Sequence, residues 1–158
     1  PDPVFVLKRE LLQVPFLGWY LSGAGNIAID RRAGFRALKV MLPQARRRLD
    51  EGAQIIVFPE GVRAAPGELH AFQPGIAALY RAAAVPVVPA ALNSGLFWRR
   101  RGFTKHPGQI TLQFLPPLPA GLDRDAFMTE LAARIGAAAS RLAAVTIVPA
   151  EKGSDNSG

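Results

Sequence analysis

The sequence contains no cysteine, which excludes disulfide bonds, thiolate metal sites and a cysteine nucleophile. Histidine is scarce as well, because His70 and His106 are the only two positions for imidazole chemistry. Acidic residues are also few: 12 aspartates and glutamates stand against 19 lysines and arginines, a formal net charge of +7. This charge favours anionic partners, such as nucleic acid, acidic lipid headgroups, a phosphorylated metabolite or an acidic carrier protein.

The sequence also lacks an apolar run suited to crossing a membrane. The uncharged stretch 11–29 contains Pro15, Gly18, Gly23 and Gly25, which would interrupt a lipid-facing helix. It predicts instead a buried helix, a turn and a strand. The sequence has no charged segment followed by an apolar one, so it does not predict a signal peptide. With 49% hydrophobic residues, we expect one folded domain over residues 1–150 and a disordered tail over 151–158.

Short apolar runs alternate with helical spacing along the chain. We expect strands at 4–7, 26–29, 54–58, 85–92 and 109–115, and helices at 11–21, 34–51, 74–84 and 123–145. The first strand should be buried on both faces. Pro43 is unfavourable inside the second helix, and Asp123 is the expected N-cap of the last one. The alternation predicts an α/β fold with a mostly parallel sheet flanked by helices.

Polar residues follow three of the predicted strands, where parallel sheets form their binding sites. They are Asp30-Arg31, Glu60-Gly61-Val62-Arg63 and Asn93-Ser94-Gly95. Gly61 allows a sharp turn or a close approach of the backbone to a ligand, and the planar guanidinium of Arg63 suits a phosphate or a carboxylate. A strand-end turn with a Glu60–Arg63 surface pair, and Asp30 as a helix cap, are equally compatible with the pattern.

Three segments together resemble the glycerolipid acyltransferases, specifically the bacterial-type 1-acylglycerol-3-phosphate (lysophosphatidate) acyltransferases. The family's second block is similar to Gly25-Asn26-Ile27-Ala28-Ile29-Asp30-Arg31, its third to Phe58-Pro59-Glu60-Gly61-Val62-Arg63 and its fourth to Val85-Pro86-Val87-Val88-Pro89. The resemblance covers about residues 3 to 120. Three blocks in the correct order and spacing make it specific.

The resemblance implies transfer of an acyl group from acyl-CoA or acyl carrier protein to the free hydroxyl of 1-acylglycerol-3-phosphate, giving phosphatidate. In the family an imidazole acts as the general base. Residues matching Arg31, Glu60, Gly61 and Arg63 are associated with holding the glycerol phosphate, and the fourth block with shaping the acyl or acceptor site. No metal or cofactor is expected besides the acyl donor. The implied location is the cytoplasmic face of the inner membrane.

The family's first block, a histidine followed five positions later by an aspartate, is absent from this sequence. Gly75 stands five positions after His70, and Thr111 five positions after His106, so neither histidine is carried over as the base. We therefore expect an N-terminally incomplete acyltransferase domain, inactive alone, whose catalytic block and membrane anchor lie upstream. A catalytically inactive lipid-binding relative is compatible with the same sequence.

Smaller departures concern the acceptor. Val62, Ala64 and Gln73 stand where many relatives have threonine, serine and lysine. These changes remove hydroxyl donors and a cation near the expected phosphate. They leave open an acyltransferase that acts on another lysolipid.

A basic aromatic segment provides a second candidate surface. Trp98, Arg99, Arg100 and Arg101 are predicted to contact an anionic membrane surface or an acidic acyl carrier protein. Alternatively, this is a solvated loop whose Phe97 and Trp98 are core anchors. A nucleic-acid-binding module is disfavoured, because the sequence has no RNP-like aromatic strand, KH-type loop or zinc spacing.

Overall fold

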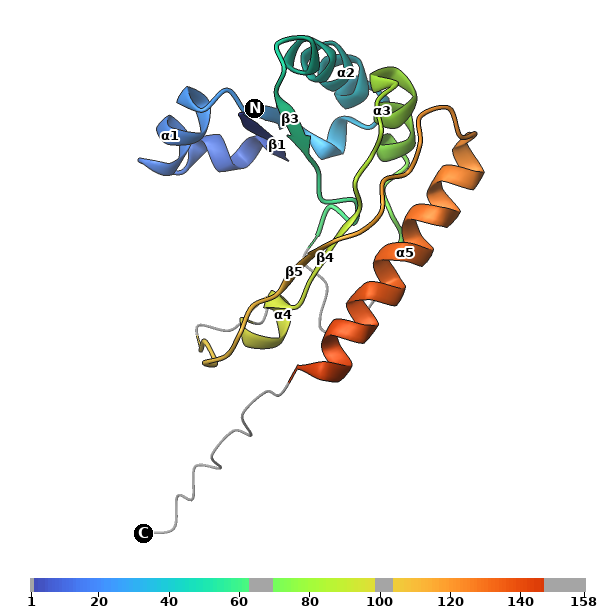
Figure 1. Ribbon diagram of the computed structural model, residues 1–158. Helices are drawn as coiled ribbons and strands as arrows, with labels where there is room; N and C mark the ends of the chain where they lie inside the picture. Colours follow the sequence, from blue (N-terminus) through green and yellow to red (C-terminus); the bar gives the residue numbers. More distant parts are fainter. Residues whose placement is uncertain (1, 63–69, 99–103, 147–158) are drawn as a thin grey trace.

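The computed structural model describes residues 2–62, 70–98 and 104–146, and contains a three-stranded parallel sheet of order β2-β1-β3 (Figure 1). Its strands are β1 (Pro3–Lys8), β2 (Ile27–Ile29) and β3 (Gln54–Ile56). A separate antiparallel pair consists of β4 (Ala90–Leu92) and β5 (Leu112–Phe114). The predicted α/β fold with a mostly parallel sheet and flanking helices is confirmed. The predicted tail at 151–158 lies outside the described residues.

The helices follow the predicted order along the chain. They are η1 (Arg9–Gln13), α1 (Leu17–Gly23), η2 (Arg31–Ala33), α2 (Phe35–Asp50), α3 (Gly75–Ala83), α4 (Ser94–Phe97) and α5 (Arg124–Val145), where η marks a 3₁₀ helix. The segment predicted as one helix at 11–21 is divided into η1 and α1. Asp123 is the N-cap of α5 as predicted, because its carboxylate accepts a hydrogen bond from Ala126 N–H at 2.8 Å.

Helix α2 covers one face of the parallel sheet. Val4 and Val6 of β1 are buried with Met41 and Ala45 of α2 in one apolar cluster. The helix continues through Pro43, which lies on its exposed face. Because proline has no N–H, one intrahelical hydrogen bond on the solvent side is lost. Phe5 points to the opposite face and is 37% exposed. The prediction that β1 is buried on both faces was therefore wrong for this residue.

The strand predicted at 85–92 is much shorter in the structure. Ordered pairing covers only Ala90–Leu92, preceded by an isolated bridge between Val87 and Leu118. Pro86 and Pro89 have no N–H groups, which explains the interrupted pairing. The strand predicted at 109–115 is likewise shorter, at Leu112–Phe114.

A second apolar cluster joins α3 to α5. The Tyr80 and Phe127 rings stack with centroids 3.8 Å apart. The buried Tyr80 hydroxyl donates to the Pro119 carbonyl at 2.5 Å and accepts from Leu122 N–H at 2.8 Å. One hydroxyl thereby fixes the linker that leads into α5 against α3. Among the described residues, no helix has the length and apolar content needed to cross a bilayer.

Replacing Tyr80 by phenylalanine should lower the free energy of unfolding by about 1–3 kcal/mol, because Leu122 N–H loses its acceptor. Tyr20→Phe is the matched control, since the Tyr20 side chain is 73% exposed. Urea denaturation followed by circular dichroism measures both variants. Equal effects of the two changes would contradict a structural role for the buried hydroxyl.

Candidate functional site

The carboxyl ends of the three parallel strands lie at one edge of the sheet. β1 pairs with β2 through Lys8 and Ile29, and with β3 through Phe5 and Ile56. The segments that continue from these ends are Arg9-Glu10, Asp30-Arg31-Arg32 and Pro59-Glu60-Gly61. The sequence placed the second and third of these at this edge, and the structure does the same. The first was missed as a site, although the strand-end rule applied equally to β1.

Acidic and basic side chains meet beyond β1 and β2. Lys8 Nζ lies 3.1 Å from Glu10 Oε1, and both side chains are partly exposed. A hydrogen bond from its own backbone N–H, then that from Lys8, lowers the pKa of Glu10 below its usual value, and the charge of Arg32 acts in the same direction. Glu10 is therefore an anion at neutral pH, held between two strand ends.

Asp30 has a local structural role at this edge. Its carboxylate accepts a hydrogen bond from Arg32 N–H at 2.9 Å and caps η2. This is the helix-cap alternative that the sequence left open. Arg31 begins η2, directly after the Asp30 cap. The cap fixes the direction in which the chain leaves β2, and so sets the position of the Arg31 backbone at the edge.

The segment after β3 makes a tight turn. Gly61 has a φ of +68° and donates its N–H to the Phe58 carbonyl at 3.0 Å. This backbone conformation favours glycine, as predicted for Gly61. Gln73 holds the turn from outside: its N–H donates to the Pro59 carbonyl at 2.8 Å and its amide to the Glu60 carbonyl at 3.4 Å.

Two carboxylate oxygens at this edge have unused hydrogen-bonding capacity. Glu10 Oε2 and Glu60 Oε2 are buried and have no hydrogen-bond partner among the described residues. A buried acceptor without a partner costs free energy, so these atoms mark where a donor from a ligand would be favourable. Arg63, predicted to act with Glu60, lies outside the described residues.

The block from Gly25 to Arg31 spans both ends of β2. Asp30 and Arg31 lie at the carboxyl edge, whereas Gly25 lies at the amino end, with a φ of +68°. A Cβ atom on Gly25 would lie 2.3 Å from Nη2 of Arg48. Gly25 is therefore a packing residue at the end of β2 opposite the candidate site.

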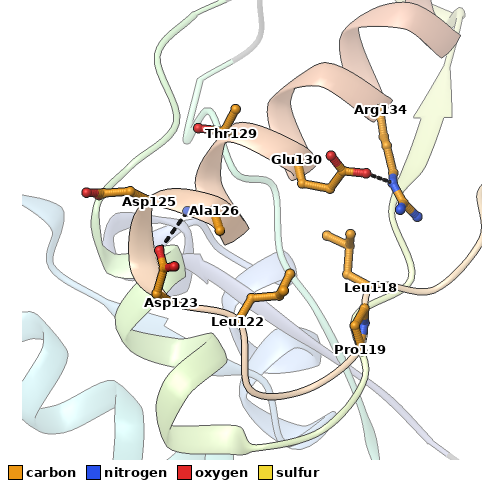
Figure 2. A pocket seen from close by; sticks show the side chains of 9 residues that line it. All are labelled: Leu118, Pro119, Leu122, Asp123, Asp125, Ala126, Thr129, Glu130 and Arg134. Carbon is orange, nitrogen blue, oxygen red and sulfur yellow. Dashed lines mark hydrogen bonds and ion pairs between the residues drawn. The ribbon is translucent and has the colours of Figure 1, made fainter.

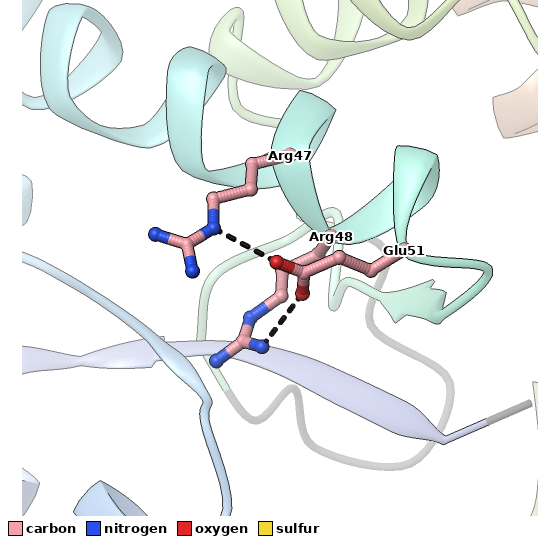
Figure 3. A network of polar contacts seen from close by, with 3 residues as sticks. All are labelled: Arg47, Arg48 and Glu51. Carbon is pink, nitrogen blue, oxygen red and sulfur yellow. Dashed lines mark hydrogen bonds and ion pairs between the residues drawn. The ribbon is translucent and has the colours of Figure 1, made fainter.

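Arg48 belongs to an ion-pair network at the end of α2 (Figure 3). Arg47 and Arg48 both donate to the Glu51 carboxylate, at 2.8 and 2.9 Å. The hydrogen bonds from Arg47 and then Arg48 lower the pKa of Glu51, and Glu51 raises that of Arg47. The network holds Arg48 against Gly25, so it explains part of the second block without a role in chemistry.

The Asn93 segment has a structural role rather than the predicted place at the sheet edge. The buried Asn93 amide donates to the Gln109 carbonyl at 3.2 Å and to Thr146 Oγ1 at 2.8 Å, and its oxygen accepts from Thr111 N–H at 2.7 Å. β4 pairs antiparallel with β5, so the strand-end rule for parallel sheets did not apply to it. Asn93 fastens α5 to this pair of strands.

The fourth block leads into β4. Val85 and Pro86 follow α3, and the buried Pro89 accepts a hydrogen bond from Leu115 N–H at 2.9 Å. The block therefore connects α3 to β4, the first strand of the antiparallel pair.

The predicted membrane or carrier segment is described only at its start. Phe97 is a core residue with 4% exposure, as the alternative interpretation expected. Trp98 is 46% exposed, and Lys105 Nζ lies 4.7 Å from its ring centroid. Arg99, Arg100 and Arg101 lie outside the described residues.

A surface hollow at the start of α5 is separate from the strand ends (Figure 2). It is lined by Leu118, Pro119, Leu122, the N-cap Asp123 and residues of α5 between Asp125 and Arg134. The Glu130–Arg134 ion pair, at 2.7 Å, lies at its rim. None of its lining residues belongs to the predicted site.

Comparisons with known proteins give a consistent result. A family model described as Acyltransferase matches residues 1–93, which include all three parallel strands. The 1-acyl-sn-glycerol-3-phosphate acyltransferase of Pseudomonas aeruginosa is 44% identical over 115 residues, 73% of this chain and 45% of that protein. The human 1-acyl-sn-glycerol-3-phosphate acyltransferase alpha is 36% identical over 124 residues, 76% of this chain and 43% of that protein.

A solved structure shares the fold. The 1-acyl-sn-glycerophosphate acyltransferase PlsC from Thermotoga maritima superposes with a TM-score of 0.71 at 23% identity, over 89% of this chain and 57% of that one. The chain spans about half the length of the curated relatives it matches.

Replacing Gly25 by alanine should destabilise the fold by about 1–3 kcal/mol, because the new Cβ meets Arg48 and the positive φ becomes strained. Gly23→Ala is the control, since a Cβ there meets nothing within 4 Å. Thermal unfolding compares the two. A Gly25→Ala variant as stable as the control would refute the packing role.

Proposed function

Since the chain belongs to the acyltransferase family, we propose that the protein transfers a fatty acyl group to the free hydroxyl of 1-acylglycerol-3-phosphate and so forms phosphatidate. The observation that carries this proposal is the 44% identity to a 1-acyl-sn-glycerol-3-phosphate acyltransferase over 115 residues. The family match includes the three parallel strands and the segments that follow them. The acyl donor in the proposal is acyl-CoA or an acyl carrier protein, and no metal takes part.

The proposed reaction needs a base, an acceptor site and a leaving group. The acceptor hydroxyl attacks the thioester carbonyl and forms the new ester bond. The C–S bond breaks, and the proton taken by the base passes to the departing thiolate. Neither His70 nor His106 is followed by an aspartate at the family spacing, so the base in this proposal comes from a His-x-x-x-x-Asp segment outside the given sequence.

The carboxyl edge of the sheet supplies the proposed acceptor site. Arg31 and Arg63 would bind the phosphate through charge-assisted hydrogen bonds. Glu60 Oε2, buried and without a partner among the described residues, would accept a hydrogen bond from the glycerol part of the acceptor. The turn at Gly61 places this carboxylate beside the end of β3. An anionic substrate at this edge is compatible with the net charge of +7.

The lipid acceptor also gives the proposal a location. A lysophospholipid is delivered from a membrane, so we place the reaction at a membrane surface, at the cytoplasmic face of the inner membrane. Other lysolipids are alternative acceptors. Gln73 supports another lysolipid as acceptor, because it stands where many relatives have a lysine. Its amide donates a hydrogen bond to the Glu60 carbonyl.

The chain as given should show no acyl transfer to lysophosphatidate, whereas the same chain extended upstream with a family His-x-x-x-x-Asp segment should be active. Release of free thiol from acyl-CoA, with lysophosphatidate, lysophosphatidylcholine and lysophosphatidylethanolamine as acceptors, measures both. Comparable turnover by the two chains would show that the base lies within the given sequence. Turnover with a different acceptor alone would reassign the substrate.

In the extended chain, Arg63→Ala should raise KM for lysophosphatidate about 10- to 100-fold, the loss of one charged hydrogen bond, and leave KM for the acyl donor nearly unchanged. Arg46→Ala, on the exposed side of α2, is the matched control for lost charge. Initial rates at varied concentrations of each substrate provide both constants. An equal rise in the two KM values would contradict phosphate binding by Arg63.

A further inference from the structure

The segment formed by η1 and α1 stands apart from the helices that cover the sheet (Figure 1). Three of its aromatic side chains are far more exposed than large apolar side chains normally are: Phe16 at 77%, Trp19 at 74% and Tyr20 at 73%. Trp19 and Tyr20 lie in α1, and Phe16 is its N-cap, with a ring that contacts the ring of Trp19. We call these three residues the α1 aromatic face.

The backbone has an unusual conformation at the start of this face. Phe16 has a φ of +63° and a ψ of −52°, and Leu17 N–H donates to the Pro15 carbonyl at 2.7 Å, which makes a γ-turn that is rare for a residue with a side chain. A Cβ on Gly18 would lie 2.0 Å from the Leu12 carbonyl oxygen, so η1 and α1 touch through their backbones. The Phe16 and Trp19 rings pack edge to face at 5.5 Å.

Cationic residues flank, in the sequence, the uncharged stretch that contains the α1 aromatic face, and η1, which begins with Arg9, contacts α1. No charged residue lies between Leu11 and Ile29, whereas Lys8 and Arg9 precede this stretch and Arg32 follows it. Arg9 and Arg32 are exposed. The acidic neighbour, Glu10, is paired with Lys8 at 3.1 Å. Exposed rings in an uncharged stretch flanked by exposed cations match the interface of an anionic bilayer, where aromatic rings lie at headgroup depth and arginines meet lipid phosphates.

A second copy of the chain fits this face less well. At about 150–250 Å² for each buried ring, three rings supply about 450–750 Å² per partner, below the roughly 800 Å² of a specific interface. A bilayer requires no complementary shape. Each aromatic side chain that inserts into its interface contributes favourable binding free energy by itself.

We propose that the α1 aromatic face inserts into the interface of an anionic lipid bilayer. Glu10 lies in η1, which contacts both α1 and β1, so insertion brings the carboxyl edge of the parallel sheet toward the membrane surface. A lysolipid would then reach the edge from the bilayer side. The choice of lipid ligand at that edge rests on the proposed function, but the membrane contact itself is tested below without measuring turnover.

The two tryptophans allow a direct test, because one lies on the α1 aromatic face and the other in the basic segment at 97–103. Trp98→Phe leaves Trp19 as the sole reporter, and Trp19→Phe leaves Trp98. With vesicles of phosphatidylcholine and phosphatidylglycerol, Trp19 emission should shift to the blue and be quenched by brominated acyl chains. Trp98 emission should change little.

Three results would overturn the proposal. Trp19 emission that stays constant while the protein sediments with vesicles would exclude the face from the contact. A blue shift of Trp98 alone would assign the contact to the basic segment. Shielding of Trp19 from acrylamide without vesicles would show that another part of the protein, or a second copy, covers the face.

Variants separate membrane contact from folding. Phe16→Gly should weaken vesicle binding about tenfold in a sedimentation assay, because one ring is lost. Its thermal unfolding midpoint should not fall, since glycine adopts the positive φ without strain. Phe114→Ser removes a ring of 69% exposure on β5 and should leave binding unchanged. Equal weakening by Phe16→Gly and Phe114→Ser would refute a contact specific to α1.

Discussion

The parallel pairing of β1 on both of its sides is the constraint on which the rest of the structure depends. β1 is the middle strand, bonded to β2 through residues 6–8 and to β3 through residues 3–5. Because all three strands run in one direction, the segments that follow them meet at one edge. Glu10, Asp30 and Glu60 come from widely separated positions in the sequence, and only this pairing brings their segments to the same edge.

The block at residues 25–31 has different roles at the two ends of β2. At the amino end of β2, Gly25 makes room for Arg48, which Glu51 holds in place. At the carboxyl end, Asp30 caps the N-terminus of the short helix η2, and Arg31 is the first residue of that helix. At the amino end Arg48 is paired with Glu51, whereas Glu10 and Glu60 at the carboxyl edge each keep a buried oxygen without a partner among the described residues. That contrast separates packing from the place where a ligand can gain hydrogen bonds.

Much of this arrangement could be predicted from sequence. Apolar runs predicted where the parallel strands lie along the chain, and Gly61 was expected to allow a sharp turn, which the structure has with a φ of +68°. The strand-end rule failed at Asn93, because periodicity cannot reveal that β4 pairs antiparallel with β5. It also left out Glu10, whose pairing with Lys8 depends on how η1 folds back beside β1. Side-chain exposure was the least predictable property, since the apolar stretch 11–29 was expected to be buried.

That stretch shows why composition and burial are different quantities. Pro15 and the glycines of this stretch exclude a membrane-crossing helix, yet they also prevent a helix long enough to pack its apolar side on the sheet. Gly18 brings α1 close to η1, and the γ-turn at Phe16 directs the chain so that the rings lie outside the core. These aromatic side chains are held outside the core by a strained backbone, and the internal contact they make is the edge-to-face packing of Phe16 on Trp19. An environment that buries the rings while leaving the nearby cations at a polar surface restores the balance, and the interface of an anionic bilayer has both properties.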